Sequence, residues 1–172
     1  MKRIAVDMDG VLADVYSQFL KMHLEEHGKE LTWADVEGVP EREAIPNIMK
    51  YVNSKGFFRN APLMPGCQKF IKLLNEKYEL YIVSAAMEFP LSLTEKQLWL
   101  NEHFPYITWK QMVFCGSKEI ISADIMIDDH FKNLDYFKGD TLLFTQPHNK
   151  FSDVGKHRRV NTWQEIGDIL LT

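Results

Sequence analysis

The sequence predicts an α/β protein: a Rossmann-like parallel sheet flanked by helices, with a small helical segment inserted near its beginning. Three observations lead to this prediction. Continuous apolar runs, typical of strands buried on both faces, alternate with helical patterns along most of the chain. Between residues 29 and 64 the pattern changes to a polar stretch with prolines and glycines and without strand-like alternation. Finally, 172 residues suffice for one domain with a small insertion.

The expected elements begin with a short apolar run at residues 3–7, which predicts a buried strand. Residues 11–28 follow with apolar side chains at a helical period, and the glycine at the end of this stretch is a plausible helix stop. Residues 32–36 and 42–55 predict short helices within the polar stretch.

From residue 65 onward, strands and helices alternate regularly. The expected elements are a helix over 65–78, a strand over 79–86, a helix over 91–104, a strand over 111–116, a short helix over 117–121, strands over 123–129 and 140–145, and a helix over 162–171 with Thr162 as N-cap. This division predicts a core domain made of residues 1–14 and 64–172, and a helical cap made of residues 15–63.

The composition limits the possible partners. A net charge of -4 gives no basic field that would attract a nucleic acid polymer or an anionic membrane, although small phosphorylated ligands remain possible. Cys67 and Cys115 have no metal-ligand spacing and fit reduced thiols. The chain starts directly into its first strand, and no apolar run approaches the ~20 residues of a membrane span. We therefore expect a cytoplasmic protein.

Polar side chains gather where the predicted strands end. They are Asp7 and Asp9 after the first strand, Ser84 after the second, Lys118 after the third, and Asp128 and Asp129 after the fourth. In parallel sheets, ligands bind outside the carboxyl ends of the strands. We therefore expect these six side chains to meet in one crevice.

Four neighbouring carboxylates repel one another unless a cation compensates them. Oxygen ligands without Cys or His suit a hard ion, so Mg²⁺ is the expected cofactor. An aspartate can attack phosphorus, and a second carboxylate nearby can protonate the leaving oxygen and then activate water. A hydroxyl and an ammonium group can hold the phosphoryl oxygens. The residue set therefore predicts phosphoryl transfer.

These motifs resemble a known family. "DMDGVLAD" resembles the first motif of haloacid-dehalogenase-type phosphatases, "YIVS" the second, Lys118 the third and "IMIDD" the fourth. Within that superfamily, the sequence is most similar to the 5'(3')-deoxyribonucleotidases. Further segments resemble that family in the same order: "GFFRNAPLMPG", "KEIISADIMIDD", "LFTQPHN" and "RRVNTWQEI". The resemblance implies a HAD-like fold and a Mg²⁺-dependent phosphomonoesterase that hydrolyses nucleoside monophosphates, preferably deoxyribonucleotides, through an aspartyl-phosphate.

The resemblance also implies roles for the metal and catalytic residues. Asp7 would attack phosphorus, and Asp9 would act as acid and then as base. The metal ligands would be Asp7, the backbone carbonyl of Asp9, and the acidic pair, with Asp129 binding directly and Asp128 through water. Lys118 would contact the phosphoryl group.

The implied substrate contacts come from four further residues. Ser84 would hold the phosphoryl group, and the Gly10 amide would donate to it. Ala85 follows Ser84 and Phe19 lies in the predicted cap, and both are candidates for contacts with the substrate. Family members are often dimers, which makes a homodimer possible.

The sequence departs from the family pattern next to these motifs. "SAA" at residues 84–86 replaces a Thr-Ser-Pro, Glu88 stands near the position of a phosphate-binding lysine, and Gly116 and Ser117 replace an Arg-Asp pair. One alternative is therefore a phosphatase for another small metabolite, such as a sugar phosphate. A receiver-like module that accepts phosphate on Asp7 is a second alternative. "HLEEH" at residues 23–27 also matches the H-x-x-E-H pattern of a zinc-protease class, although a solvated helix face explains it better.

Overall fold

The computed structural model describes residues 1–172, and its centre is a six-stranded parallel sheet with the strand order β3-β2-β1-β4-β5-β6. The strands are β1 (Arg3–Asp7), β2 (Glu79–Ser84), β3 (Met112–Phe114), β4 (Ile125–Asp128), β5 (Asp140–Phe144) and β6 (Arg158–Val160). Val6 pairs with Ile82 of β2 on one side and with Ile127 of β4 on the other. The first strand therefore lies inside the sheet, and the predicted fold class is confirmed.

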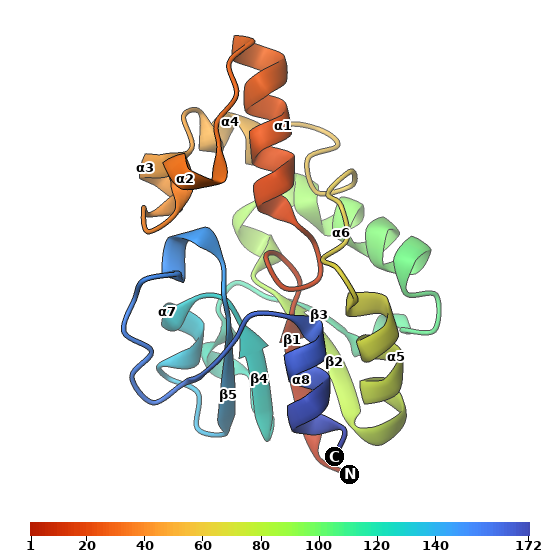
Figure 1. Ribbon diagram of the computed structural model, residues 1–172. Coiled ribbons are helices and arrows are strands. Elements are labelled where there is room, and N and C mark those ends of the chain that lie inside the picture. The colour runs from red at the N-terminus through yellow and green to blue at the C-terminus, as the bar shows by residue number, and fades with distance from the viewer.

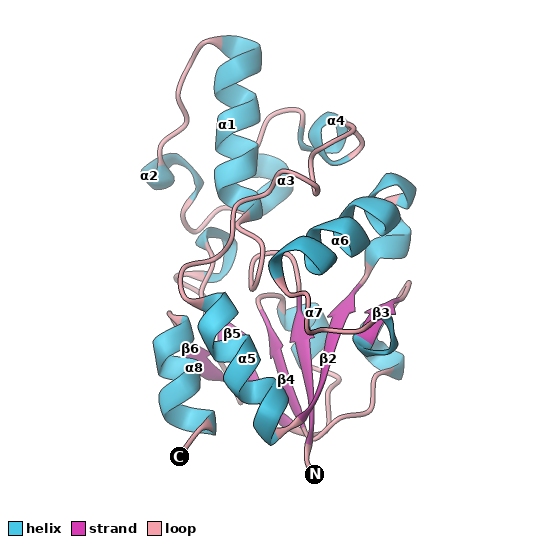
Figure 2. Ribbon diagram, turned by 90° about the vertical axis from the view of Figure 1, so that its right-hand side faces the viewer, coloured by secondary structure: helices cyan, strands magenta, loops and turns pink.

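Helices cover both faces of the sheet (Figure 2). They are α5 (Cys67–Lys77), α6 (Pro90–His103), α7 (Phe131–Leu134) and α8 (Trp163–Leu170). Along β1, Ile4 and Val6 belong to the larger core cluster, which includes the buried side chains of α5, α6 and α8. Ala5 points the other way and packs in a smaller cluster with Leu134 of α7. This alternation follows from the two-residue period of a strand.

Four further helices lie beyond the carboxyl ends of the strands (Figure 1). They are α1 (Val15–His27), α2 (Trp33–Val36), α3 (Glu41–Ala44) and α4 (Ile48–Val52). The two chain segments that lead into and out of this group run side by side: the Asp14 amide donates to Pro62 O, and the Met64 amide donates to Leu12 O, both at 2.8 Å. None of the helices in the structure is both long and apolar enough to cross a membrane.

Two expected helices have different bounds in the structure. The first begins at Val15 rather than at residue 11, because the preceding residues form a turn in which the amides of Leu12 and Ala13 both donate to Met8 O. The expected helix over 42–55 is divided into α3 and α4, with Pro46 between them. Proline has no amide hydrogen, and it disfavours helical backbone at the residue before it.

Two elements were not expected from the sequence. Helix α7 has four residues and β6 has three, which is too short for a periodic pattern. Pairing with β5 forms β6, even though its sequence begins with two arginines. Short 3-10 helices connect several elements: η1 (Ala86–Glu88), η2 (Trp109–Gln111), η3 (Lys118–Ile120) and η4 (Pro147–Asn149). The predicted N-cap is confirmed, since the Thr162 side chain accepts from the Glu165 amide at 3.2 Å.

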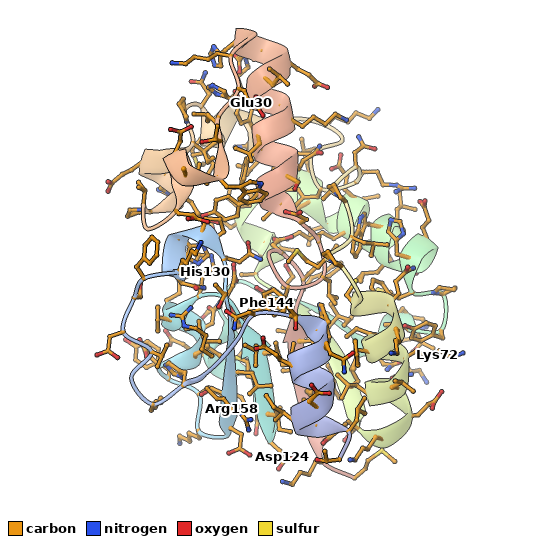
Figure 3. All side chains as sticks on the ribbon, in the orientation of Figure 1. Glu30, Lys72, Asp124, His130, Phe144 and Arg158 are labelled. Carbon is orange, nitrogen blue, oxygen red and sulfur yellow. The ribbon has the colours of Figure 1, made fainter.

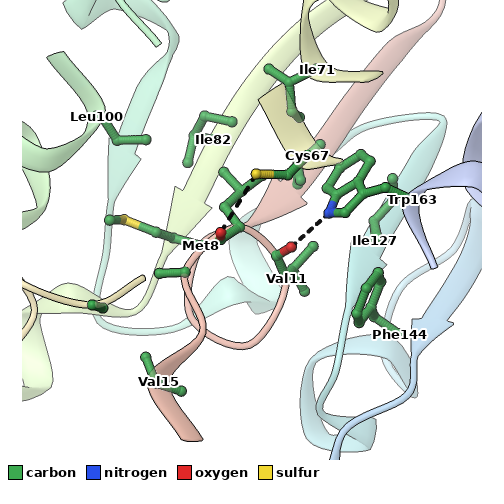
Figure 4. Packing of buried hydrophobic residues seen from close by; sticks show 14 of the residues in the cluster. Met8, Val11, Val15, Cys67, Ile71, Ile82, Leu100, Ile127, Phe144 and Trp163 are labelled. Carbon is green, nitrogen blue, oxygen red and sulfur yellow. Dashed lines mark hydrogen bonds between the residues drawn. The ribbon is translucent and has the colours of Figure 1, made fainter. Parts of the chain in front are cut away.

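The turn after β1 is fixed by the core (Figure 4). The buried Trp163 side chain donates from Nε1 to Val11 O at 2.8 Å, and Cys67 Sγ lies 3.7 Å from Leu12 O. Cys67 and Cys115 are both free and buried, and burial raises the pKa of the Cys67 thiol to about 12. The turn that carries the first acidic motif is therefore held against the interior.

Candidate active site

The carboxyl edge of the sheet brings the predicted polar residues together. Asp7 ends β1, Ser84 ends β2, Asp128 ends β4 with Asp129 directly after it, and Lys118 begins η3. All five of these side chains are buried. A single cavity is lined by Asp7, Asp9, Ser84, Ala85, Lys118, Asp129 and Phe19. Five of the six expected side chains therefore line one cavity, and the sixth, Asp128, contacts Lys118 without lining it.

Lys118 joins two carboxylates in the interior. Its Nζ lies 2.6 Å from Asp7 Oδ1 and 2.6 Å from Asp128 Oδ2. Burial alone would lower the pKa of Lys118, but the two carboxylates raise it above its ordinary value. The pKa of Asp7 is raised to about 7, by burial first and then by the charge of Asp128, against the effect of Lys118. Lys118 therefore remains a cation in this site, and Asp7 needs further positive charge to be fully ionised at neutral pH.

The two neighbouring aspartates have different surroundings. Asp128 Oδ1 accepts from the His130 amide and from Asn133 Nδ2, and its Oδ2 accepts from Lys118 and Asn133. Burial raises the pKa of Asp128, but these donors outweigh it and the net shift is downward. Asp129 Oδ1 is buried without any partner, and burial together with Asp7 and Asp128 raises the Asp129 pKa well above its ordinary value. Asp129 therefore has an uncompensated oxygen, and Asp128 has none.

Asp129 lies next to a backbone position that only glycine suits. Gly10 has φ +74°, in the left-handed region, and a Cβ there would stand 2.4 Å from Asp129 Oδ2. The Gly10 amide donates to Ala13 O at 2.8 Å, so it is already engaged within the turn. Gly10 therefore lets the backbone of the first motif approach Asp129, and its contact with phosphate stays a prediction.

The loop after β5 holds both acidic motifs in place. Asn149 Nδ2 donates to Asp129 O at 2.8 Å, and His148 Nε2 lies 3.0 Å from the same oxygen. Gln146 Nε2 donates to Gly10 O at 2.6 Å. These residues belong to the "TQPHN" stretch, one of the segments that resemble the family. Their contacts hold the first and fourth motifs next to each other.

Sequence reasoning missed Lys96. This residue of α6 has a side chain only 2% exposed, and its Nζ lies 2.5 Å from Asp9 Oδ2 and 2.9 Å from Ser84 Oγ. A signal was available: Lys96 stands three and four residues before Trp99 and Leu100, on the buried face of its helix. A lysine on a buried face is rare unless it has a partner. Lys96 thus adds a second ammonium group, besides that of Lys118, to the lining of the cavity.

Part of the cavity lining is an aromatic wall of four rings. Phe19 of α1 lies 4.7 Å from Phe57 between ring centroids, Phe57 lies 4.8 Å from Phe58, and Phe58 lies 6.1 Å from Phe89. All four rings line the same cavity as Asp7. Phosphoryl chemistry next to an aromatic wall suits a phosphate ester whose leaving group is largely apolar or aromatic.

Glu41 connects the α1–α4 helices to the sheet edge. Its carboxylate lies 3.6 Å from His130 Nε2 and 3.7 Å from His148 Nδ1, and the two imidazole rings stack at 4.3 Å. Burial first, and then Asp9, raises the pKa of Glu41 to about 7. Burial and the charge of His148 lower the pKa of His130 to about 3, so this ring is neutral. His130, labelled in Figure 3, lies where these helices approach the sheet.

The histidines of the "HLEEH" stretch do not form a metal-binding group. The rings of His23 and His27 stand 4.5 Å apart on α1. A metal site needs at least three ligands close together, and no His, Cys, Asp or Glu joins this pair with all ligand atoms within 4.8 Å of one another. The structure therefore does not support the zinc alternative.

A divalent cation fits the acidic group. Carboxylate oxygens of Asp7, Asp128 and Asp129 lie within 4.8 Å of one another, and one of them is the buried Asp129 oxygen without a partner. An all-oxygen donor set favours a hard ion over zinc or copper.

Known structures share this architecture. A HAD hydrolase of Bacillus subtilis bound to magnesium superposes with a TM-score of 0.63 at 16% identity and covers 99% of both chains. A HAD family hydrolase of Deinococcus radiodurans with bound phosphate and sodium gives a TM-score of 0.61 at 13% identity, over 99% of this chain and 95% of the other. The chain thus has the fold of the haloacid dehalogenase hydrolases.

The particular family follows from closer relatives. The family model described as "5' nucleotidase, deoxy (Pyrimidine), cytosolic type C protein" matches residues 1–172. The 5'(3')-deoxyribonucleotidase of Bacillus subtilis strain 168 is 38% identical over 180 residues, covering 99% of each chain. A Staphylococcus epidermidis protein, provisionally given the same name, is 40% identical over 173 residues, covering 96% of this chain and 93% of the relative. This chain belongs to the cytosolic type C 5'-nucleotidase family, and it is a phosphoric monoester hydrolase.

Proposed function

We propose that this enzyme hydrolyses nucleoside monophosphates, preferably deoxyribonucleotides, through a phosphoryl group carried on Asp7. The observation that carries the proposal is the shared cavity, which the buried Asp7–Lys118 pair lines together with four phenylalanine rings. The polar groups suit a phosphate ester, and the rings suit a nucleobase or a deoxyribose. The family membership and the name of the B. subtilis relative support this choice of substrate.

The cation that we propose is Mg²⁺. Asp7, the Asp9 carbonyl and Asp129 would bind it directly, and Asp128 would bind it through water, because the Asp128 oxygens already have protein donors. The unpartnered Asp129 oxygen supports this assignment. When bound, the ion would offset the acidic charge and polarise the phosphoryl oxygens. The magnesium bound to the B. subtilis HAD hydrolase, which shares this fold, is consistent with the choice.

Asp7 is the proposed nucleophile. Its Oδ1 lies 2.6 Å from Lys118 Nζ and accepts from the Met8 amide at 2.7 Å, and these contacts hold the carboxylate at the end of β1. As the new Asp7–phosphorus bond forms, the bond to the leaving oxygen breaks and Asp9 donates its proton to that oxygen. Asp9 then takes a proton from water, which attacks phosphorus and breaks the bond to Asp7. Inorganic phosphate leaves, and both aspartates return to their initial states.

The phosphoryl oxygens are held by groups from three elements. Ser84 ends β2, Lys96 lies on α6, and Lys118 lies on η3. The two ammonium groups offset the negative charge that is distributed over these oxygens in the transition state. Lys96 also contacts Asp9, so it fixes the position of the carboxyl group that is proposed to transfer the proton.

We further propose that residues 15–63 act as a cap on the core made of residues 1–14 and 64–172. Phe19 and Glu41 come from this segment and line the cavity together with the core residues. Closure of the cap would exclude bulk water from the aspartyl-phosphate until the leaving group has departed. Ala85 and Phe19, which both line the cavity, remain proposed contacts of the substrate.

Phosphate release by the purified protein tests the proposal. With Mg²⁺ present, a panel of deoxyribo- and ribonucleoside monophosphates should be hydrolysed faster than sugar phosphates. Asp7→Asn should abolish turnover because an amide is a poor nucleophile, whereas Asp168→Asn on the exposed side of α8 should retain it. A panel in which sugar phosphates are the preferred substrates would overturn the choice of substrate. A phospho-form stable for hours would favour the receiver-like alternative.

A further inference from the structure

Glu95 of α6 makes an unusual set of contacts with the segment that follows α4. Its Oε1 accepts from the Gly56 amide at 2.5 Å, and its Oε2 accepts from the amides of Phe58 and Arg59 at 3.1 and 3.2 Å. Three backbone donors therefore converge on one partly buried carboxylate. Bonds of this kind are charge-assisted, and they are stronger than bonds between neutral groups.

The segment held in this way carries part of the aromatic wall. Phe57 and Phe58 are 1% and 3% exposed, and both line the cavity. Phe57 packs against Phe19, and the Phe58 ring lies 4.4 Å from Lys96 Nζ. The backbone bonds to Glu95 fix where these two rings stand, because both ring positions lie within the span of the three bonded amides.

Adjacent residues of α6 thus contact both parts of the cavity lining. Lys96 contacts Asp9 and Ser84, and Glu95 holds the segment that carries Phe57 and Phe58. The position of these two rings relative to the phosphoryl site is therefore fixed in part through α6.

We propose that Glu95 is a positioning residue that determines how well the enzyme recognises the nucleoside part of its substrate, without taking part in phosphoryl transfer. This inference rests on the proposed function. It predicts that a change at Glu95 weakens the use of substrates with a large leaving group and spares substrates whose leaving group does not reach the aromatic wall.

Glu95→Gln is the main variant, and acetyl phosphate is the probe without a ring. Gln keeps the size of Glu95 but loses the charge, and its amide nitrogen would face backbone donors. We expect KM for a deoxyribonucleoside monophosphate to rise about tenfold or more. The kcat/KM for acetyl phosphate should stay within about threefold of the wild-type value. Glu102→Gln is the matched control, because Glu102 lies on the same helix and contacts only the exposed Arg59 side chain.

Hydrogen exchange supplies a second measurement. The amides of Gly56, Phe58 and Arg59 should exchange more slowly in the wild type than in Glu95→Gln. Glu95→Asp keeps the charge on a shorter side chain, so it should give intermediate values of KM and of the amide exchange rates. It replaces Glu95→Gln as the test variant if the Gln variant does not fold.

The outcomes separate the inference from the proposed function. A wild-type enzyme that hydrolyses acetyl phosphate but no nucleotide overturns the proposed function, and this inference with it. If the wild type is active on nucleotides and Glu95→Gln leaves KM unchanged, the inference alone is overturned. An equal loss of kcat/KM for nucleotide and acetyl phosphate also overturns it, because that result indicates a general structural role.

Discussion

Replacing Lys96 by methionine is the sharpest test of the proposed phosphoryl site. Methionine has nearly the same length as the apolar stem of lysine, so the change removes the ammonium group and leaves little cavity. Asp9 Oδ2 and Ser84 Oγ would each lose a donor, at 2.5 and 2.9 Å. The variant therefore tests the charge of this buried side chain rather than its volume.

The structure gives the expected size of two effects. Removing a preorganised donor from developing negative charge typically costs about 100- to 1000-fold in rate, or about 3–4 kcal/mol, and Lys96 also holds Asp9. The effect on the free energy of unfolding should be smaller. The Asp9 side chain is 32% exposed and can be hydrated when its partner is lost, so we expect about 1 kcal/mol. The activity should thus fall far more than the stability.

The assay is phosphate release with saturating Mg²⁺, combined with thermal unfolding. Lys72→Met on the exposed side of α5 is the control and should match the wild type in both measurements. A Lys96→Met enzyme that keeps kcat/KM within about fivefold of the wild type would refute the reasoning. So would a loss of stability large enough to explain the loss of activity.

Three further predictions concern the turn after β1 and its acidic surroundings. Gly10→Ala should lower the free energy of unfolding by about 2–4 kcal/mol, because an alanine there has a strained left-handed backbone and its Cβ clashes with Asp129. A denaturant titration that finds no loss of stability would contradict this prediction. In metal-free protein, the pKa of Asp7 is raised to about 7 and that of Asp129 is also raised, so the folded state binds more protons than the unfolded state above the ordinary aspartate pKa of about 4. The contribution of Asp7 to stability is therefore lost as the pH rises towards 7, and Tm should fall between about pH 5 and 7. Asp129→Asn should reduce this dependence of Tm on pH. It should also reduce the rise in Tm when Mg²⁺ is added. A wild-type Tm that does not change with pH would contradict the prediction. Trp163→Phe should cost about 1–3 kcal/mol because Val11 O loses its buried donor, and urea unfolding measures this.

Much of the fold could be predicted because most of its strands and helices show their pattern within a short stretch of sequence. Strands such as Arg3–Asp7 and Ile125–Asp128 are continuous apolar runs, and the chemistry of a parallel sheet lies at its carboxyl edge. The elements that were missed, α7 and β6, are too short to show a period and depend on pairing or packing with distant segments. The turn at residues 11–14 was assigned to a helix, because the hydrogen bonds to Met8 O that form it are not visible in the order of residues.

The sequence by itself determined which residue types would meet at the sheet edge, because Asp7, Ser84 and Asp129 directly follow or end strands whose direction is fixed. Only the tertiary structure decided which of two neighbouring aspartates keeps an oxygen without a partner, and which lysine reaches Asp9. The reason is geometric. A strand end is placed by hydrogen bonds within the sheet, whereas the reach of Lys96 depends on how α6 rotates and packs over the sheet, and no short stretch of sequence fixes that rotation.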